Sequence, residues 1–173
     1  MTNLRFRIIS GCLLTLGLST SILAEDSASD LHNFSYPKTD NSGKPAVLVK
    51  GEFSGDHLNV SVIDTVRGDL NNDKKSDGVV IVLEDTGGSG NFRFLCTFLN
   101  DGKNLVCSSC VLLGDRIKIT DLTIKNKSIV VNYLDRAPQE SFALPVHIKK
   151  QRVYQVKQGK LILIDETVRD AIK

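Results

Sequence analysis

From Ala46 onward the chain is a succession of short apolar runs separated by turn residues. Short runs rich in β-branched and aromatic side chains are typical of strands, because such side chains pack well on a pleated sheet. Asp101-Gly102 between two such runs is a strong hairpin signal. The pattern predicts strands over residues 46–53, 58–65, 78–83, 92–99, 104–113, 116–124, 128–134, 148–156 and 160–164.

The order of these runs predicts a mainly β fold. Short strands joined by short connectors favour a single antiparallel meander, which forms either a sandwich or a partly closed barrel. We expect one β domain over 46–164 and a C-terminal tail over 165–173, where only a short helix fits the pattern. Residues 25–45 are rich in polar residues and proline, so we expect a flexible arm or linker there, with Phe34 and Tyr36 able to dock onto the domain.

The first 24 residues have the pattern of a signal peptide. Arg5 and Arg7 precede an apolar stretch, and Ala24 offers a small residue at a cleavage point. An alternative is a lipid anchor at Cys12, but the apolar core lies mostly after that residue rather than before it. We therefore expect cleavage near Ala24, a periplasmic or secreted mature protein and no transmembrane span in it.

The charge of the mature chain argues against nucleic acid as a partner. The full chain has a formal charge of +2, and loss of residues 1–24 removes two arginines and no acid. A neutral chain has no basic stripe with which to displace counterions from a phosphate backbone. The absence of tryptophan is a weaker argument against a carbohydrate site built on aromatic stacking.

A polar loop precedes the apolar run at 79–83. Asp69, Asn71, Asp73 and Asp77 occupy the first, third, fifth and ninth places of this loop, and Lys75 offers its backbone carbonyl. Oxygen ligands at alternate positions of a tight loop suit a hard cation, so the spacing predicts a Ca²⁺ site. The alternative is a solvated turn in which the loop lysines neutralise the acids.

The wider context favours calcium through a resemblance. The segment G-D-L-N-N-D at 68–73, followed by D-G-V-V at 77–80, resembles the G-D-L-N-G-D-G-x-x-D-A loops of FG-GAP/VCBS-like and dockerin-like calcium sequences. The order of features over 68–163, including G-G-S-G at 87–90 and L-L-G-D-R at 112–116, is similar to that of a family of small bacterial exported proteins, often described as lipoproteins. The resemblance implies a cell-envelope location and no established activity.

The loop departs from the family pattern at one position. Lys74 stands where the family has glycine, which supplies the positive φ of a sharp turn. A lysine adopts that conformation at a cost of about 1 kcal/mol and brings a positive charge towards the cation. We therefore expect calcium binding that is weak and structural rather than catalytic.

The cysteines of the mature chain predict one disulfide. If Asp101-Gly102 is a two-residue loop, Cys96 lies directly opposite Cys107, within the range that a disulfide accepts. In an oxidising compartment outside the cytoplasm this pair would form a disulfide, and Cys110 would remain a free thiol. The C-x-x-C form at 107–110 also resembles a redox motif, but it lies among strand formers rather than at the start of a helix, so we prefer a structural bridge.

Nothing in the sequence forms a convincing catalytic set. We expect a non-enzymatic domain that binds an envelope protein or a glycan, as an adaptor or an inhibitor. The rival hypothesis is a periplasmic hydrolase with an acid–base pair drawn from Asp69, Asp73 or Asp85. Against it, the sequence shows no nucleophile supported by a histidine.

Two Asp-Arg dipeptides, at 115–116 and 135–136, each follow an apolar run. We expect their charges to hold loops in place by ion pairing, or else to take part in recognition.

Overall fold

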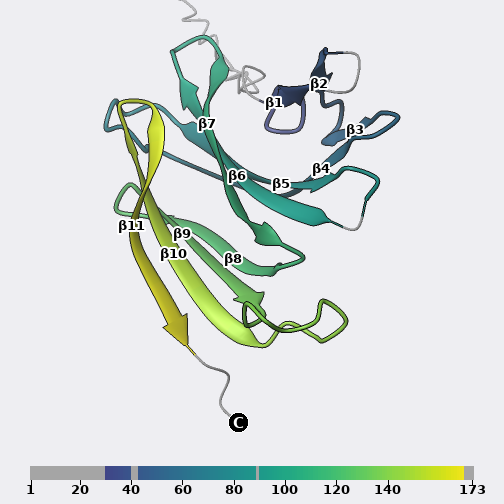
Figure 1. Ribbon diagram of the computed structural model, residues 1–173. Helices are drawn as coiled ribbons and strands as arrows, with labels where there is room; N and C mark the ends of the chain where they lie inside the picture. The colour runs from purple at the N-terminus through teal and green to yellow at the C-terminus, as the bar shows by residue number, and fades with distance from the viewer. Residues whose placement is uncertain (1–29, 40–42, 89, 170–173) are drawn as a thin grey trace, which may run out of the picture.

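The computed structural model describes residues 30–39, 43–88 and 90–169, and its regular elements are all β-strands (Figure 1). This confirms the mainly β prediction. The strands are β1 (Ser35–Thr39), β2 (Pro45–Val47), β3 (Glu52–Ser54), β4 (Asn59–Gly68), β5 (Asp77–Asp85), β6 (Asn91–Asn100), β7 (Leu105–Asp115), β8 (Lys118–Lys125), β9 (Ser128–Asp135), β10 (Ile148–Lys157) and β11 (Lys160–Arg169).

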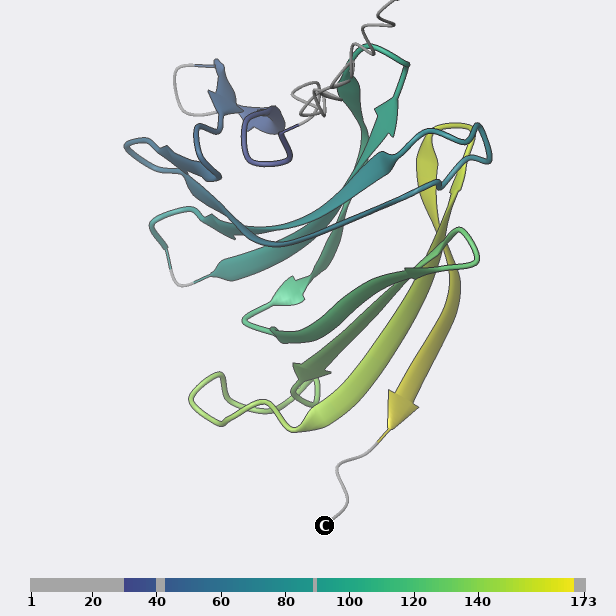
Figure 2. The ribbon, with the colours of Figure 1, turned by 180° about the vertical axis from the view of Figure 1, so that it is seen from behind.

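Two antiparallel sheets stack face to face, and a small two-stranded sheet lies above them (Figures 1 and 2). The larger sheet has the order β3-β4-β5-β6-β7 and the smaller one the order β11-β10-β9-β8. Neighbours in each sheet are consecutive in sequence, as in a meander. Because β7 leads into β8 without pairing to it, the sheets stay separate, and the sandwich alternative is the one that forms.

The main core lies between the two stacked sheets. Val79 and Ile81 of β5 and Leu95 of β6 point into it from the larger sheet, and Val131 and Tyr133 of β9 point into it from the smaller one. All five side chains are buried. Alternation along each strand sends every second residue to this layer, which is the expected result of strand geometry.

A second core covers the other face of the larger sheet. Val80 and Val82 of β5 point into it and meet Leu31, Tyr36 and Leu48 from the N-terminal segment. Since β5 is covered on both faces, its apolar run is continuous rather than alternating, as in other strands buried on both sides. The β1–β2 sheet and the residues around it form the third layer of the molecule (Figure 1).

The ends of the domain differ from their predicted boundaries. Residues 25–45, expected to form a flexible arm, include β1 and the first residue of β2, and Tyr36 is fully buried. The expected C-terminal helix is wrong for 165–169, which continue β11 through pairing with β10. The remaining residues of that tail, and the predicted signal peptide, lie outside the described residues.

Candidate functional site

The 69–77 loop is held by hydrogen bonds between its own side chains and backbone. Asp69 accepts from the backbone N–H groups of Asn72 (2.6 Å) and Lys74 (3.1 Å). Desolvation raises the pKa of Asp69, but these hydrogen bonds outweigh it and the pKa is lowered overall. Asp73 accepts from the N–H of Lys75 at 2.9 Å, so the carboxylates of the loop fold the turn themselves.

Lys74, at the position where the calcium-loop pattern has glycine, has the positive φ that the sequence predicts. Lys74 has φ +66° and Asn72 has φ +70°, both in the left-handed region. Lysine adopts this conformation because two side chains, Asp69 and Asp73, fix the backbone on either side of it.

Asp77 anchors the loop instead of folding its exposed turn. It is fully buried, and its two carboxylate oxygens accept from the N–H of Leu70 (2.8 Å) and the N–H of Asn100 (2.9 Å). It therefore ties the loop to the end of β6. The structure brings Asp69, Asn71, Asp73 and Lys75 into one turn, but within the described ranges no three Asp, Glu, His or Cys side chains converge as metal ligands. Calcium binding here stays a prediction.

The predicted Cys96–Cys107 disulfide is wrong. Asp101 and Asn104 close a four-residue loop through a 3.1 Å backbone hydrogen bond, so Asn100 pairs with Leu105 rather than facing Lys103. Asp101 stabilises this longer loop by accepting from the backbone of Lys103 and of Asn104.

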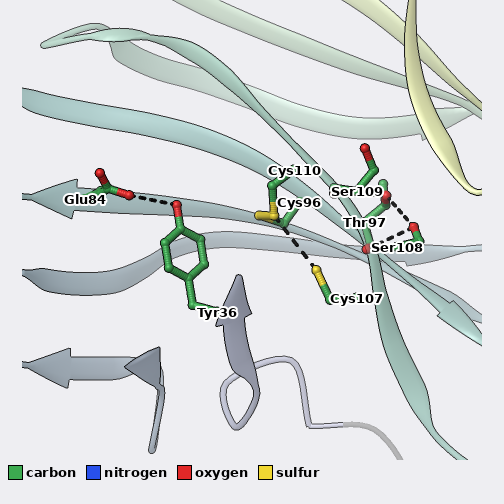
Figure 3. Close-up of a disulfide and its surroundings, with 8 residues drawn as sticks. All are labelled: Tyr36, Glu84, Cys96, Thr97, Cys107, Ser108, Ser109 and Cys110. Carbon is green, nitrogen blue, oxygen red and sulfur yellow. Dashed lines mark hydrogen bonds between the residues drawn. A yellow bond between two sulfur atoms is a disulfide. The ribbon is translucent and has the colours of Figure 1, made fainter. Parts of the chain in front are cut away.

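A bulge beyond the loop shifts the register once more. Phe98 lies opposite Cys107, whereas Cys96 lies opposite Cys110 and is bonded to it. Cys107 is the free thiol among the described cysteines, and its Sγ lies 3.9 Å from Sγ of Cys110 (Figure 3). Burial raises the pKa of the Cys107 thiol.

Next to these sulfurs, a buried carboxylate ties the N-terminal segment to β5. Glu84 accepts from the hydroxyl of Tyr36 at 3.0 Å and from Nζ of Lys38 at 2.7 Å (Figure 3 shows the tyrosine contact). Burial and the Glu84 charge raise the pKa of Tyr36. Sequence reasoning missed Glu84, although an acid inside an otherwise apolar strand is the signal that points to a buried partner.

The outer face of the smaller sheet is hollowed into an open groove of about 340 Å³. Asn132 of β9 accepts at Oδ1 from Gln151 of β10 (2.8 Å) and donates from Nδ2 to Asp121 of β8 (3.1 Å). Thr167 of β11 lies opposite Gln151, which places a row of polar side chains across all four strands. The groove is lined by Thr120, Asn132, Tyr133, Leu134, Lys149, Lys150, Gln151, Thr167 and Arg169.

A second row beside the first carries positive charge. Lys149 lies opposite both Leu134 and Arg169, and Lys118 lies opposite Leu134 on the other side. Residues opposite one another on neighbouring strands share a face, so the three cations point the same way as the polar row. Within the described part of the chain, none of these three cations lies within 4 Å of a carboxylate.

The two Asp-Arg dipeptides support loops. Asp115 accepts from the N–H of Asn91 at 2.7 Å, and Asp135 pairs with Lys150 at 2.8 Å. Arg136 donates to the carbonyl of Arg116 at 3.2 Å, so the loop after β9 is tied to the turn before β8. These contacts favour the structural interpretation.

Comparison with known proteins adds no family. No protein-family model, no curated protein and no solved structure matches the chain. Among the described residues there is no helix long and apolar enough to cross a membrane.

Proposed function

We propose that this chain is an exported, non-enzymatic binding protein of the cell envelope, of the adaptor or inhibitor type, and that it binds an anionic saccharide. The observation that carries the proposal is the groove on the outer face of the smaller sheet, where the polar row lies beside the cationic row. Amide and hydroxyl groups complement sugar hydroxyls, and Lys149 and Arg169 complement a carboxylate, sulfate or phosphate.

The spacing of the cations suits a single anionic group. Lys149 and Arg169 are direct neighbours on β10 and β11, about 5 Å apart at the backbone. The arrangement depends on hydrogen bonding and charge, so it needs no tryptophan platform. The disulfide between Cys96 and Cys110 also supports an oxidising compartment.

The lining of the groove favours binding over hydrolysis. Its residues include no histidine, cysteine or carboxylate that could act as nucleophile or general base. A rival acid–base pair that includes Asp85 is spread along β5, because Asp69 and Asp73 lie in the loop before this strand and Asp85 is its last residue. At about 3.3 Å per residue, the two ends of β5 are about 26 Å apart, too far for two carboxylates to act on one bond. Asp69 and Asp73 lie in one turn, where both accept hydrogen bonds from the backbone of the loop.

The test is a binding titration of the full chain with polygalacturonate, a polymer of uronic acids, followed by calorimetry or NMR shifts. We expect binding in the high micromolar to millimolar range that weakens with added salt, and little binding of neutral dextran. Lys149→Ala combined with Arg169→Ala should weaken binding at least tenfold.

The matched control removes two positive charges from the opposite end of the same sheet. Lys125→Ala combined with Lys157→Ala changes the net charge equally, and both residues are exposed. We expect this variant to bind almost as well as the unchanged protein. Absence of binding, or an equal loss in both double variants, would contradict the proposal.

A further inference from the structure

Three sulfur atoms lie together on the face of the larger sheet that the N-terminal segment covers. Cys96 on β6 and Cys110 on β7 form the disulfide, and the free thiol of Cys107 is 3.9 Å from Sγ of Cys110 (Figure 3). Sulfurs at this distance are in van der Waals contact. The free thiol therefore lies next to the bond that it could attack.

A β-bulge creates this arrangement. In a regular strand, residues three apart point to opposite faces and their Cα atoms are about 10 Å apart, too far for a disulfide. Here Cys107 lies opposite Phe98 and Cys110 lies opposite Cys96, so three steps along β7 match two steps along β6. The cysteines consequently share one face, and their Cα atoms are about 7 Å apart, near the upper limit for a disulfide.

The extra residue of the bulge is anchored to the neighbouring strand. Ser108 has its hydroxyl 2.9 Å from the hydroxyl of Thr97 and donates to the carbonyl of Thr97 at 3.2 Å. Thr97 is fully buried and Ser108 is half-buried, so these hydrogen bonds are partly shielded from water. The serine within the C-x-x-C sequence thus fixes the backbone that brings both cysteines to one face.

We propose that Cys96, Cys107 and Cys110 form an internal thiol–disulfide exchange site. The Cys107 thiolate attacks Sγ of Cys110, a Cys107–Cys110 bond forms, and the Cys96–Cys110 bond breaks. Cys96 leaves as a thiolate and takes up a proton from solvent, replacing the one that Cys107 released. The step is an isomerisation with no net oxidation, so it needs no external oxidant or reductant.

The exchange changes both the covalent structure and the accessible thiol. The bond between Cys96 and Cys110 joins β6 to β7, whereas a Cys107–Cys110 bond lies within β7 and leaves the hairpin without a covalent link. The free thiol moves from half-buried Cys107 to fully buried Cys96. An incoming thiol reagent or a partner dithiol therefore meets a reactive thiol in one isomer only.

The surroundings of Cys107 set the pH range of the exchange. The thiol interacts electrostatically with Tyr36 of β1, which is hydrogen-bonded to Glu84 of β5, and Glu84 also pairs with Lys38. No described cation contacts the thiol directly, so the thiolate forms only at alkaline pH. Because the thiolate fraction rises about tenfold per pH unit below the pKa, the exchange should accelerate by about a hundredfold between pH 6.5 and 8.5.

The experiment maps the disulfides of the full chain in a Cys12→Ser background. Protein held at acidic pH is shifted to pH 8.5, quenched with acid at intervals, unfolded in denaturant so that buried thiols also react, blocked with a thiol reagent and digested for mass spectrometry. We expect the Cys107–Cys110 peptide and a blocked Cys96 to accumulate with time. In the Cys107→Ser control, only the Cys96–Cys110 bond should be found, which excludes scrambling during digestion.

A second variant tests the proposal when the population of the exchanged isomer is too small to detect. Cys96→Ala leaves Cys107 and Cys110 as a dithiol, and oxidised glutathione should convert it to a monomer with an internal Cys107–Cys110 bond. A dithiol that persists, or that forms only linked dimers, would overturn the proposal. These results do not depend on saccharide binding, because the groove lies on the other sheet.

Discussion

At the scale of single residues, Asp77 shows how one carboxylate can be structural inside a loop that looks like a ligand set. Its two oxygens accept from backbone N–H groups that come from different parts of the chain, the loop at Leu70 and the end of β6 at Asn100. Both contacts are buried or half-buried, so their loss leaves two donors without partners. The neighbouring acids of the loop are more exposed and hold only the local turn.

Asp77→Ala should therefore destabilise the protein by about 2–4 kcal/mol, because each unsatisfied buried donor costs roughly 1–3 kcal/mol. Asp73→Ala is the matched control, since it removes a carboxylate from the exposed part of the same loop and should cost no more than about 1 kcal/mol. Urea unfolding without added calcium checks both values.

The same unfolding measurement with 5 mM Ca²⁺ tests the predicted calcium site. Bound calcium should raise the free energy of unfolding of the unchanged protein and not that of Asp73→Ala. No change in the free energy of unfolding would contradict the calcium hypothesis.

At the scale of elements, the N-terminal segment is a layer of the fold and not a tether. Leu31 lies over Gly78 of β5, and a methyl group at Gly78 would come within 2.3 Å of its side chain. The segment is also tied by Tyr36 and Lys38 to Glu84, at the other end of the same strand. The glycine thus allows close approach at one end of β5, and the buried carboxylate provides the attachment at the other.

Gly78→Ala should displace Leu31 and loosen residues 30–39, with a loss of stability of about 1–3 kcal/mol, since overpacking of a dense core forces its neighbours to shift. Hydrogen exchange followed by mass spectrometry should show faster exchange in that segment and little change in β9 and β10. Gly88→Ala is the control, because a methyl group there meets no atom closer than 3.9 Å. Unchanged protection of residues 30–39 in Gly78→Ala would contradict this account of the third layer.

At the scale of the whole molecule, the buried tyrosines limit stability at alkaline pH. Burial raises the pKa of Tyr133 to about 12 and also raises that of Tyr154, whereas an unfolded tyrosine titrates near pH 10. The folded state therefore holds these protons more tightly than the unfolded state. Their contribution is fully present below pH 10 and is lost as the pH rises to about 12 and beyond.

Unfolding free energy should accordingly fall between pH 10 and 12, by about 2–3 kcal/mol for Tyr133 alone. Tyr133→Phe should flatten this fall. At neutral pH it should be neutral or slightly stabilising, because the Tyr133 hydroxyl is buried and has no hydrogen-bond partner among the described residues. The control, Tyr36→Phe, loses its hydrogen bond to Glu84 and should cost about 1–2 kcal/mol at pH 7. A Tyr133→Phe variant that is clearly less stable at pH 7 would contradict the assignment.

Much of the fold could be predicted from local pattern. The apolar runs predicted the larger strands, and their consecutive order predicted the meander, because alternation and turn chemistry act over a few residues. The site was predicted less well. The burial of Glu84 and the groove around Gln151 depend on which strands become neighbours. The spacing of residues along the chain does not indicate that.

The sequence by itself determined that the chain folds as antiparallel strands, that Lys74 must adopt a strained turn, and that a disulfide forms in the β6–β7 hairpin. Only the tertiary structure decided which cysteines pair, that β5 is buried on both faces, and that Asp77 faces the sheet. The longer loop shifts the register of this hairpin by two residues, and the single bulge shifts it by one more. Alternative strand pairings differ in local free energy by only about 1 kcal/mol, so the packing of segments distant in sequence decides between them.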